Sequence, residues 1–350
     1  MSFKFDPSAT ISSEFGIFGI PITEQQSQVV LLPVPWEVTT SYGKGAADGP
    51  TLIRQASEQI DLFDRELGKA FEAGYFMRPV SSEIRDKNDK FKAIAQEVIA
   101  LSTQLSDDVA KIEKLQSQVN QASQELTQWV YTQSKDILDS GKLLGLVGGD
   151  HSTPLGAIKA VIEKYGEVGI LHFDAHADLR EAYQGFEQSH ASIMYNVVHL
   201  PQPPKKLVQV GIRDFSEEEY KLSTENPRIK TFFDQDLKDQ LHNGKSWANI
   251  CEEILNELPT NIYISFDIDG LDPRLCPHTG TPVPGGLSLD QVFFLFKKIV
   301  QSGRKIVAFD LNEVSSGGLD LDDAEWDGNV GSRLLYKLCG WLVRSQSEKV

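Results

Sequence analysis

The sequence predicts an α/β fold with a central parallel sheet, and two observations lead to this prediction. Short, almost continuous apolar runs recur along the 350-residue chain. Such runs are typical of strands that are buried on both faces of a parallel sheet. Several of them are separated by segments that can form amphipathic helices. Alternating strands and helices indicate a doubly wound architecture, in which helices cover both faces of the sheet.

Six apolar runs are expected to form strands, at residues 29–33, 143–147, 168–173, 207–210, 262–266 and 306–309. Three of the intervening segments are expected to be amphipathic helices, at residues 154–164, 247–258 and 289–302. Ser152 or Thr153 is the expected N-cap of the first, because a side-chain oxygen there can accept a hydrogen bond from a free backbone N–H.

Residues 80–140 depart from this alternation of strands and helices. They contain neither Gly nor Pro, and their apolar residues recur at steps of three or four. The pattern predicts one long amphipathic helix, or two antiparallel helices broken near residues 106–108. Such a segment either covers the sheet or protrudes as a coiled-coil hairpin that contributes to oligomerisation. We expect residues 1–350 to form one domain, with 80–140 as a helical insertion that lies away from the site described below.

Composition excludes several classes of protein. The 34 Lys and Arg against 50 Asp and Glu give a net charge of −16, which argues against a nucleic-acid binder. No uncharged apolar stretch approaches the roughly 18 residues that a membrane span needs. The three cysteines are far apart and show no C-x-x-C spacing, so we expect a reducing, cytoplasmic location.

The most informative chemistry follows the apolar run 168–173, where Asp174, His176 and Asp178 alternate with small residues. In an extended segment these three side chains point to one side. Ligand sites in open α/β sheets lie beyond the carboxyl ends of strands, which is where this cluster falls.

Two further strand ends carry similar residues: Asp150 and His151 follow the run 143–147, and Asp267 and Asp269 follow 262–266. Crowded carboxylates repel each other unless cations neutralise them. Carboxylate and imidazole ligands together suit Mn²⁺, and Zn²⁺, Fe²⁺, Co²⁺ or Ni²⁺ are chemically possible. The pattern therefore favours a site for two metal ions.

Four motifs in this order resemble the signature blocks of the arginase/agmatinase (ureohydrolase) family. They are Gly-Gly-Asp-His-Ser at 148–152, Asp-Ala-His-Ala-Asp at 174–178, Ser-Phe-Asp-Ile-Asp at 265–269 with Asp-Pro at 272–273, and Pro-Gly-Gly-Leu-Ser at 284–288. The resemblance covers roughly residues 28–80 and 140–345. It implies a three-layer α/β/α domain with a mostly parallel, eight-stranded sheet, two Mn²⁺ ions, and hydrolysis of a guanidino group to urea and an amine. It also implies a homo-oligomer, either a trimer or a hexamer.

Carried over by motif, the resemblance implies a role for each candidate residue. One metal would be held by His151, Asp174, Asp178 and Asp267, and the other by His176, Asp174, Asp267 and Asp269. Asp269 would also orient the attacking oxygen. Glu313 matches the family's guanidinium-binding glutamate, and His190 matches its mobile proton-shuttle histidine. His172, His199, His242 and His278 match no ligand position and are expected to be structural or surface residues.

The proposed reaction suits these residues. A guanidinium carbon is a poor electrophile, so its hydrolysis needs a strong nucleophile. Cation coordination supplies one, because it lowers the pKa of water from 15.7 toward about 7.

The loop 179–189 indicates the substrate. It lacks the polar set with which arginases bind the substrate's α-carboxylate, so agmatine, hydrolysed to putrescine and urea, is the expected substrate. Arg180 could instead bind the carboxylate of guanidinobutyrate, and Glu181 or Glu187 could bind an amine. Arginine or guanidine as substrate, and a non-catalytic metal-binding protein with a role in assembly, remain the alternatives.

Overall fold

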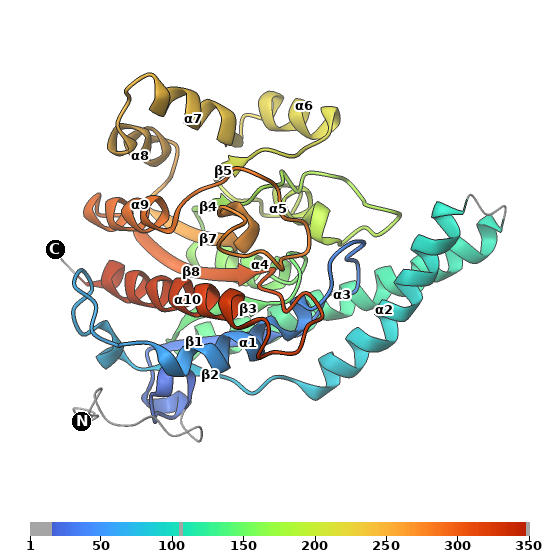
Figure 1. The fold of residues 1–350 in the computed structure, drawn as a ribbon, viewed down its shortest axis with the longest axis horizontal. Helices are drawn as coiled ribbons and strands as arrows, with labels where there is room; N and C mark the ends of the chain where they lie inside the picture. The colour runs from blue at the N-terminus through green and yellow to red at the C-terminus, as the bar shows by residue number, and fades with distance from the viewer. Residues whose placement is uncertain (1–15, 105–107, 348–350) are drawn as a thin grey trace.

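The computed structural model describes residues 16–104 and 108–347, and its architecture is an eight-stranded sheet between two layers of helices (Figure 1). The strands are β1 (Val29–Val34), β2 (Tyr75–Met77), β3 (Leu143–Gly148), β4 (Val168–Phe173), β5 (Lys206–Ile212), β6 (Ile229–Phe233), β7 (Asn261–Asp267) and β8 (Lys305–Asn312). All neighbouring strands are parallel, in the order β2-β1-β3-β8-β7-β4-β5-β6. The predicted parallel sheet is confirmed.

Ten α-helices occur in the described residues. They are α1 (Gly49–Ala56), α2 (Ser82–Thr103), α3 (Val109–Asp139), α4 (Leu155–Tyr165), α5 (Ile193–Val198), α6 (Glu217–Glu225), α7 (Asp234–His242), α8 (Trp247–Asn256), α9 (Leu289–Gln301) and α10 (Glu325–Gln346). The buried apolar residues form two clusters, one on each face of the sheet. Helices α1, α8, α9 and α10 belong to one cluster, and α3, α4 and α5 to the other. The sheet and the helices on its two faces therefore form the three layers of an α/β/α arrangement.

The two strands that the apolar pattern missed lie at the edges of the sheet. Strand β2 has only three residues, and β6 alternates buried Ile229 with exposed Lys230, so neither gives a continuous apolar run. The expected cap of α4 was also wrong. Its N-cap is Pro154, while the Ser152 hydroxyl donates to Asp150 and the Thr153 hydroxyl to Asn312.

The segment 80–140 forms two helices, as the second of the two alternatives predicted. Asp108 caps α3 by accepting a hydrogen bond from the Lys111 N–H at 3.2 Å. Residues 106–107 of the expected break lie outside the described residues. Helix α3 packs on α4 and the sheet, while the far ends of α2 and α3 project beyond the body of the molecule (Figure 1). The segment thus both covers the sheet and protrudes.

No helix in the described ranges is long and apolar enough to span a bilayer.

Candidate metal centre and substrate pocket

The loop after β3 brings His151 to the rim of the sheet because glycine lets the chain pass close to its neighbour. A Cβ atom at Gly149 would lie 1.8 Å from the carbonyl oxygen of Trp36, so a larger residue does not fit. The backbone N–H of His151 then donates to Glu313 Oε1 at 3.0 Å. His151 is buried, so its ring faces the cluster and not the solvent.

The carboxyl end of β4 supplies Asp174, His176 and Asp178. The chain leaves the extended conformation after Phe173, since the His176 N–H donates to Asp174 Oδ1 at 2.6 Å and Asp178 has a φ of 54°. A turn brings these side chains together, in place of the alternation along a strand that the sequence predicted.

The carboxyl end of β7 supplies Asp267 and Asp269. Asp267 ends the strand, and Asp269 lies in a short 3₁₀ helix, Ile268–Gly270. The Asp269 N–H donates to Asp267 Oδ1 at 2.9 Å, and Asp269 Oδ1 accepts from the Ala175 N–H at 3.0 Å. These bonds fix both carboxylates toward β4.

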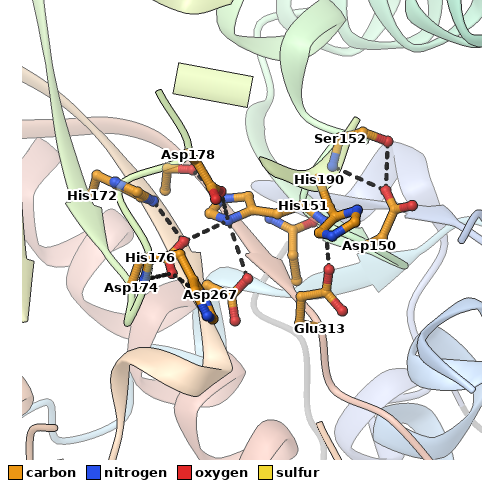
Figure 2. Close-up of polar contacts among 12 residues, drawn as sticks. Asp150, His151, Ser152, His172, Asp174, His176, Asp178, His190, Asp267 and Glu313 are labelled. Atoms are coloured by element: carbon orange, nitrogen blue, oxygen red, sulfur yellow. Dashed lines mark hydrogen bonds and ion pairs between the residues drawn. The ribbon is translucent and has the colours of Figure 1, made fainter. Parts of the chain in front are cut away.

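The six predicted ligands converge in two groups that share Asp174. In the first, His151 Nδ1 lies 3.0 Å from Asp174 Oδ2, 3.4 Å from Asp178 Oδ2 and 3.2 Å from Asp267 Oδ2 (Figure 2). In the second, His176 Nδ1 lies 3.4 Å from Asp174 Oδ1 and 3.1 Å from Asp269 Oδ2.

Burial makes the charges of this cluster costly. It raises the pKa of Asp178 to about 7 and that of Asp267 well above its usual range, and neighbouring carboxylates add to both shifts. Burial alone would lower the pKa of His151, but its hydrogen bonds to Asp174, Asp178 and Asp267 raise it well above 6.5. Protons balance the negative charge when no cation is present, and divalent cations can replace them. Four carboxylates and two imidazoles are a donor set that fits a pair of such cations.

A buried histidine outside the predicted ligands supports Asp174. Gln209 Nε2 donates to the Ala177 carbonyl at 2.7 Å, which fixes the orientation of the amide, and it also donates to His172 Nδ1 at 3.0 Å. His172 Nε2 therefore carries the proton and donates to Asp174 Oδ2 at 2.9 Å. The ligand atoms of His172, His151, Asp174 and Asp178 lie within 4.8 Å of one another. In this arrangement the N–H of His172 Nε2 is directed at Asp174, and the bond orients that carboxylate.

Glu313 follows β8 and is held in an unusual backbone conformation. Its φ is 62°, and its N–H donates to the Gly149 carbonyl at 2.8 Å. Positive φ at a residue other than glycine costs free energy and is found preferentially at functional sites. Burial and the nearby charge of Asp150 raise the pKa of Glu313 well above 4.5. A guanidinium group beside it would restore the carboxylate form.

His190 lies at the start of the 3₁₀ helix His190–Ser192. Its N–H donates to Thr39 Oγ1 at 3.3 Å, and its Nδ1 lies 3.4 Å from the same oxygen. Its ring and that of Tyr183 are nearly perpendicular, with 5.7 Å between their centroids. Burial lowers the pKa of His190 to about 4, and the charge of His176 adds to the shift, so the ring is neutral in this arrangement.

A pocket of about 500 Å³ opens over the cluster and is lined by Glu313 and His190. Arg180 lies in its wall, with its guanidinium 5.3 Å from the centroid of the Tyr183 ring and its Nε 3.5 Å from Glu219 Oε2.

The pattern of acidic residues at strand ends also applies to β5, although none of the four motifs includes it. Asp214 follows this strand and lines the pocket, as does Glu219 a few residues later. The two acids that the sequence analysis considered for an amine, Glu181 and Glu187, are exposed and are not among the lining residues.

Comparison with known proteins agrees with the motifs. A model described as the arginase family matches residues 27–337, a span that runs across α2 and α3. An N(1)-aminopropylagmatine ureohydrolase of Thermus thermophilus is 32% identical over 296 residues, which are 84% of this chain and 85% of that protein. The agmatinase of Bacillus anthracis is 29% identical over 299 residues, 83% of this chain and 84% of that protein.

A solved structure shares the fold. The proclavaminate amidino hydrolase of Streptomyces clavuligerus aligns over 97% of this chain and 100% of its own, with a TM-score of 0.71 and 23% identity. The match of the family model over most of the residues, together with the 32% identical relative, confirms the resemblance seen in the four motifs, and the chain belongs to the arginase family.

Proposed function

We propose that this protein uses two divalent cations to hydrolyse a guanidino compound to urea and an amine. The observation that carries the proposal is the convergence of six ligand side chains from three strand ends on one pocket, with Glu313 and His190 in its wall. Family membership supports the same reaction class.

The proposed ligand sets follow the two groups, except that the resemblance adds Asp267 to the second set as a shared ligand. His151, Asp174, Asp178 and Asp267 would hold one cation, and His176, Asp174, Asp267 and Asp269 the other. Bound divalent cations lower the pKa of water and so supply a nucleophile at neutral pH. The donor set and the resemblance favour Mn²⁺, with Ni²⁺ or another divalent metal as the alternative.

Glu313 is proposed to bind the guanidinium group. Its Oε1 is occupied by the His151 N–H, and no donor among the described residues reaches Oε2, which remains available for a charge-assisted hydrogen bond. Asp269 would accept a hydrogen bond from the attacking water and orient it. His190 would carry the proton that the leaving amine needs.

Agmatine is the proposed substrate. The curated relatives that are named after agmatine or its aminopropyl derivative support it, and Asp214 offers a carboxylate in the pocket for a terminal ammonium group. Arg180 favours the second candidate, a guanidino acid such as guanidinobutyrate, because no described residue accepts a hydrogen bond from its terminal nitrogens.

A panel assay decides between these substrates. Urea release is measured from agmatine, N(1)-aminopropylagmatine, guanidinobutyrate, arginine and guanidine, with protein loaded with Mn²⁺ or Ni²⁺. The Asp267→Asn variant is the control for contaminating activity. Urea from agmatine above all others supports the proposal. No urea from any compound with either metal would contradict it and favour a non-catalytic protein.

Three further expectations belong to this proposal. We propose a homo-oligomer, a trimer or hexamer, which native mass spectrometry can test. We propose a cytoplasmic location, which three free, buried cysteines support. We also propose that residues 80–140 are an insertion in a single domain.

A further inference from the structure

The loop that leads to His190 begins with a tight turn at Tyr183–Phe186. The N–H of each of these two residues donates to the carbonyl of the other, at 3.0 and 2.9 Å. Between them, Gln184 and Gly185 have φ values of 56° and 81°. Two consecutive left-handed residues are typical of a two-residue hairpin turn. Phe186 is fully buried and anchors one side of the turn.

Side chains of α3 bind the exposed backbone of this turn. Gln116 Nε2 donates to the Gln184 carbonyl at 2.9 Å. Asn120 makes two bonds, donating through Nδ2 to the Gly185 carbonyl at 3.0 Å and accepting through Oδ1 from the Glu187 N–H at 3.0 Å. Gln116 and Asn120 are four residues apart, so they lie one above the other on one face of the helix.

The fit between helix and turn is close. A Cβ atom at Gly185 would lie 2.0 Å from Gln116 Nε2, so the Gln116 side chain keeps this position only beside glycine, which also suits the left-handed φ. Farther along α3, the Thr127 hydroxyl donates to Gln188 Oε1 at 2.8 Å. The contact therefore extends along the loop from Gln184 to Gln188.

Helix α2 holds a second loop beside the pocket in a similar way. Asn88 Oδ1 accepts from the Glu37 N–H at 2.7 Å, and Lys92 forms an ion pair with the Glu37 carboxylate. Glu37 Oε2 in turn accepts from the N–H groups of Gly45 and Ala46, at 2.7 and 2.8 Å. The loop fixed in this way carries Thr39, the partner of His190.

We propose that the helical hairpin α2–α3 positions the substrate pocket, and that Gln116 and Asn120 are positioning residues for Tyr183 and His190. None of the residues that line the pocket belongs to 80–140, in line with the expected separation of this segment from the metal residues. Covering the sheet or contributing to oligomerisation does not account for the bonds from α3 to the loop that leads to His190. The inference rests on the proposed function for its kinetic readout.

The test compares Gln116→Ala, Asn120→Ala and the double variant with Gln128→Ala. Gln128 is an exposed amide on the same helix whose side chain, among the described residues, bonds only to Thr132 of α3, so it is a matched control. We expect amide hydrogen exchange at residues 183–190 to be about tenfold faster in the double variant, and kcat/KM to fall about tenfold for each lost amide side chain. Metal content and the control should stay at wild-type values.

Isosteric variants guard against loss of folding. Gln116→Glu keeps the size of the side chain but loses its donor, and Asn120→Asp keeps the acceptor for the Glu187 N–H and should recover part of the activity. Unchanged exchange in the double variant overturns the inference, and so does faster exchange with kcat/KM within twofold of wild type. If the wild-type protein releases no urea from any compound, the proposed function fails, and the exchange measurement alone decides whether the hairpin holds the loop.

Discussion

Glu313 is fixed in place by the protein before any substrate binds. Its N–H and its Oε1 are bonded to the backbone of Gly149 and His151. The positive φ of Glu313 costs conformational free energy, and the tertiary contacts around the residue offset that cost. Binding of the proposed guanidinium group at Glu313 would therefore need little rearrangement.

Glu313→Gln should weaken substrate binding as well as turnover. The amide can keep the bond to the His151 N–H, but the guanidinium loses its charged partner, at about 2–5 kcal/mol. Steady-state kinetics with metal analysis on the same sample checks this. Loss of metal from the variant would mean that Glu313 is a ligand and not a substrate contact.

His190→Ala should act chiefly on turnover, by about 10²–10⁴-fold, if His190 transfers the proton to the leaving amine. His199→Ala is the control, because this exposed C-cap residue of α5 has, among the described residues, a side-chain hydrogen bond only to the Tyr195 carbonyl. Both variants should retain metal. A value of kcat at neutral pH equal to that of wild type would rule out the proton-transfer role.

Gln209→Met should weaken metal binding by about 10- to 100-fold. The change removes the donor that fixes the His172 tautomer, so the bond from His172 to Asp174 loses its orientation. Titration of the metal-free protein with Mn²⁺ measures the effect. Thr231→Val removes only the hydroxyl that donates to Gln209 Oε1, so its effect should be smaller. Equal affinity in wild type and the Met variant would contradict this role for His172.

At the scale of elements, helix α3 has two separable roles. Its apolar stripe, which includes Val119, Leu126 and Val130, is buried against the rest of the molecule. Its amide side chains Gln116 and Asn120 bind the loop that leads to His190. The apolar face of α3 therefore stabilises the fold, and its two amide side chains position the loop beside the pocket.

Leu126→Ala should lower the free energy of unfolding by about 2–5 kcal/mol, because a buried side chain is replaced by a cavity. Chemical denaturation measures this loss. At temperatures where the variant is folded, kcat/KM should remain near wild type, in contrast to the Gln116 and Asn120 variants. A large kinetic effect in the folded Leu126 variant would mean that the two roles of α3 are not separable.

At the scale of the whole molecule, metal binding should stabilise the fold. The four carboxylates come from β4 and β7, so their repulsion acts on the centre of the sheet. A cation that binds only the folded state adds about 2.7 kcal/mol at a hundredfold excess over Kd. For a chain of this size that raises Tm by about 4 °C for each metal. Thermal unfolding with Mn²⁺ and after chelation tests this, and identical curves would contradict the metal site.

Most of the sheet and of the metal cluster could be predicted because they depend on local patterns. Continuous apolar runs identified the strands buried on both faces, whereas the edge strands β2 and β6 gave no such run. The convergence of Asp174, His176 and Asp178 was predicted, although a turn produces it and not strand alternation. Arg180 was singled out from the sequence. Asp214 was not, although it follows β5 as the predicted ligands follow their strands, because it belongs to none of the four motifs.

The sequence by itself determined the α/β class, the order of the strand ends that carry the predicted ligands, and the family. Each of these depends on short stretches of contiguous residues. Tertiary structure alone decided the partners of side chains that are far apart in the chain. The bonds of Gln116 and Asn120 to residues more than 60 positions away are of this kind, as are the tautomer of His172 and the contact between Thr39 and His190. The physical reason is that a hydrogen bond depends on distance and direction in space. Residues far apart in the chain meet only when the sheet and its two helical layers have packed. The periodicity of the sequence therefore contains no information about the distance or direction between them.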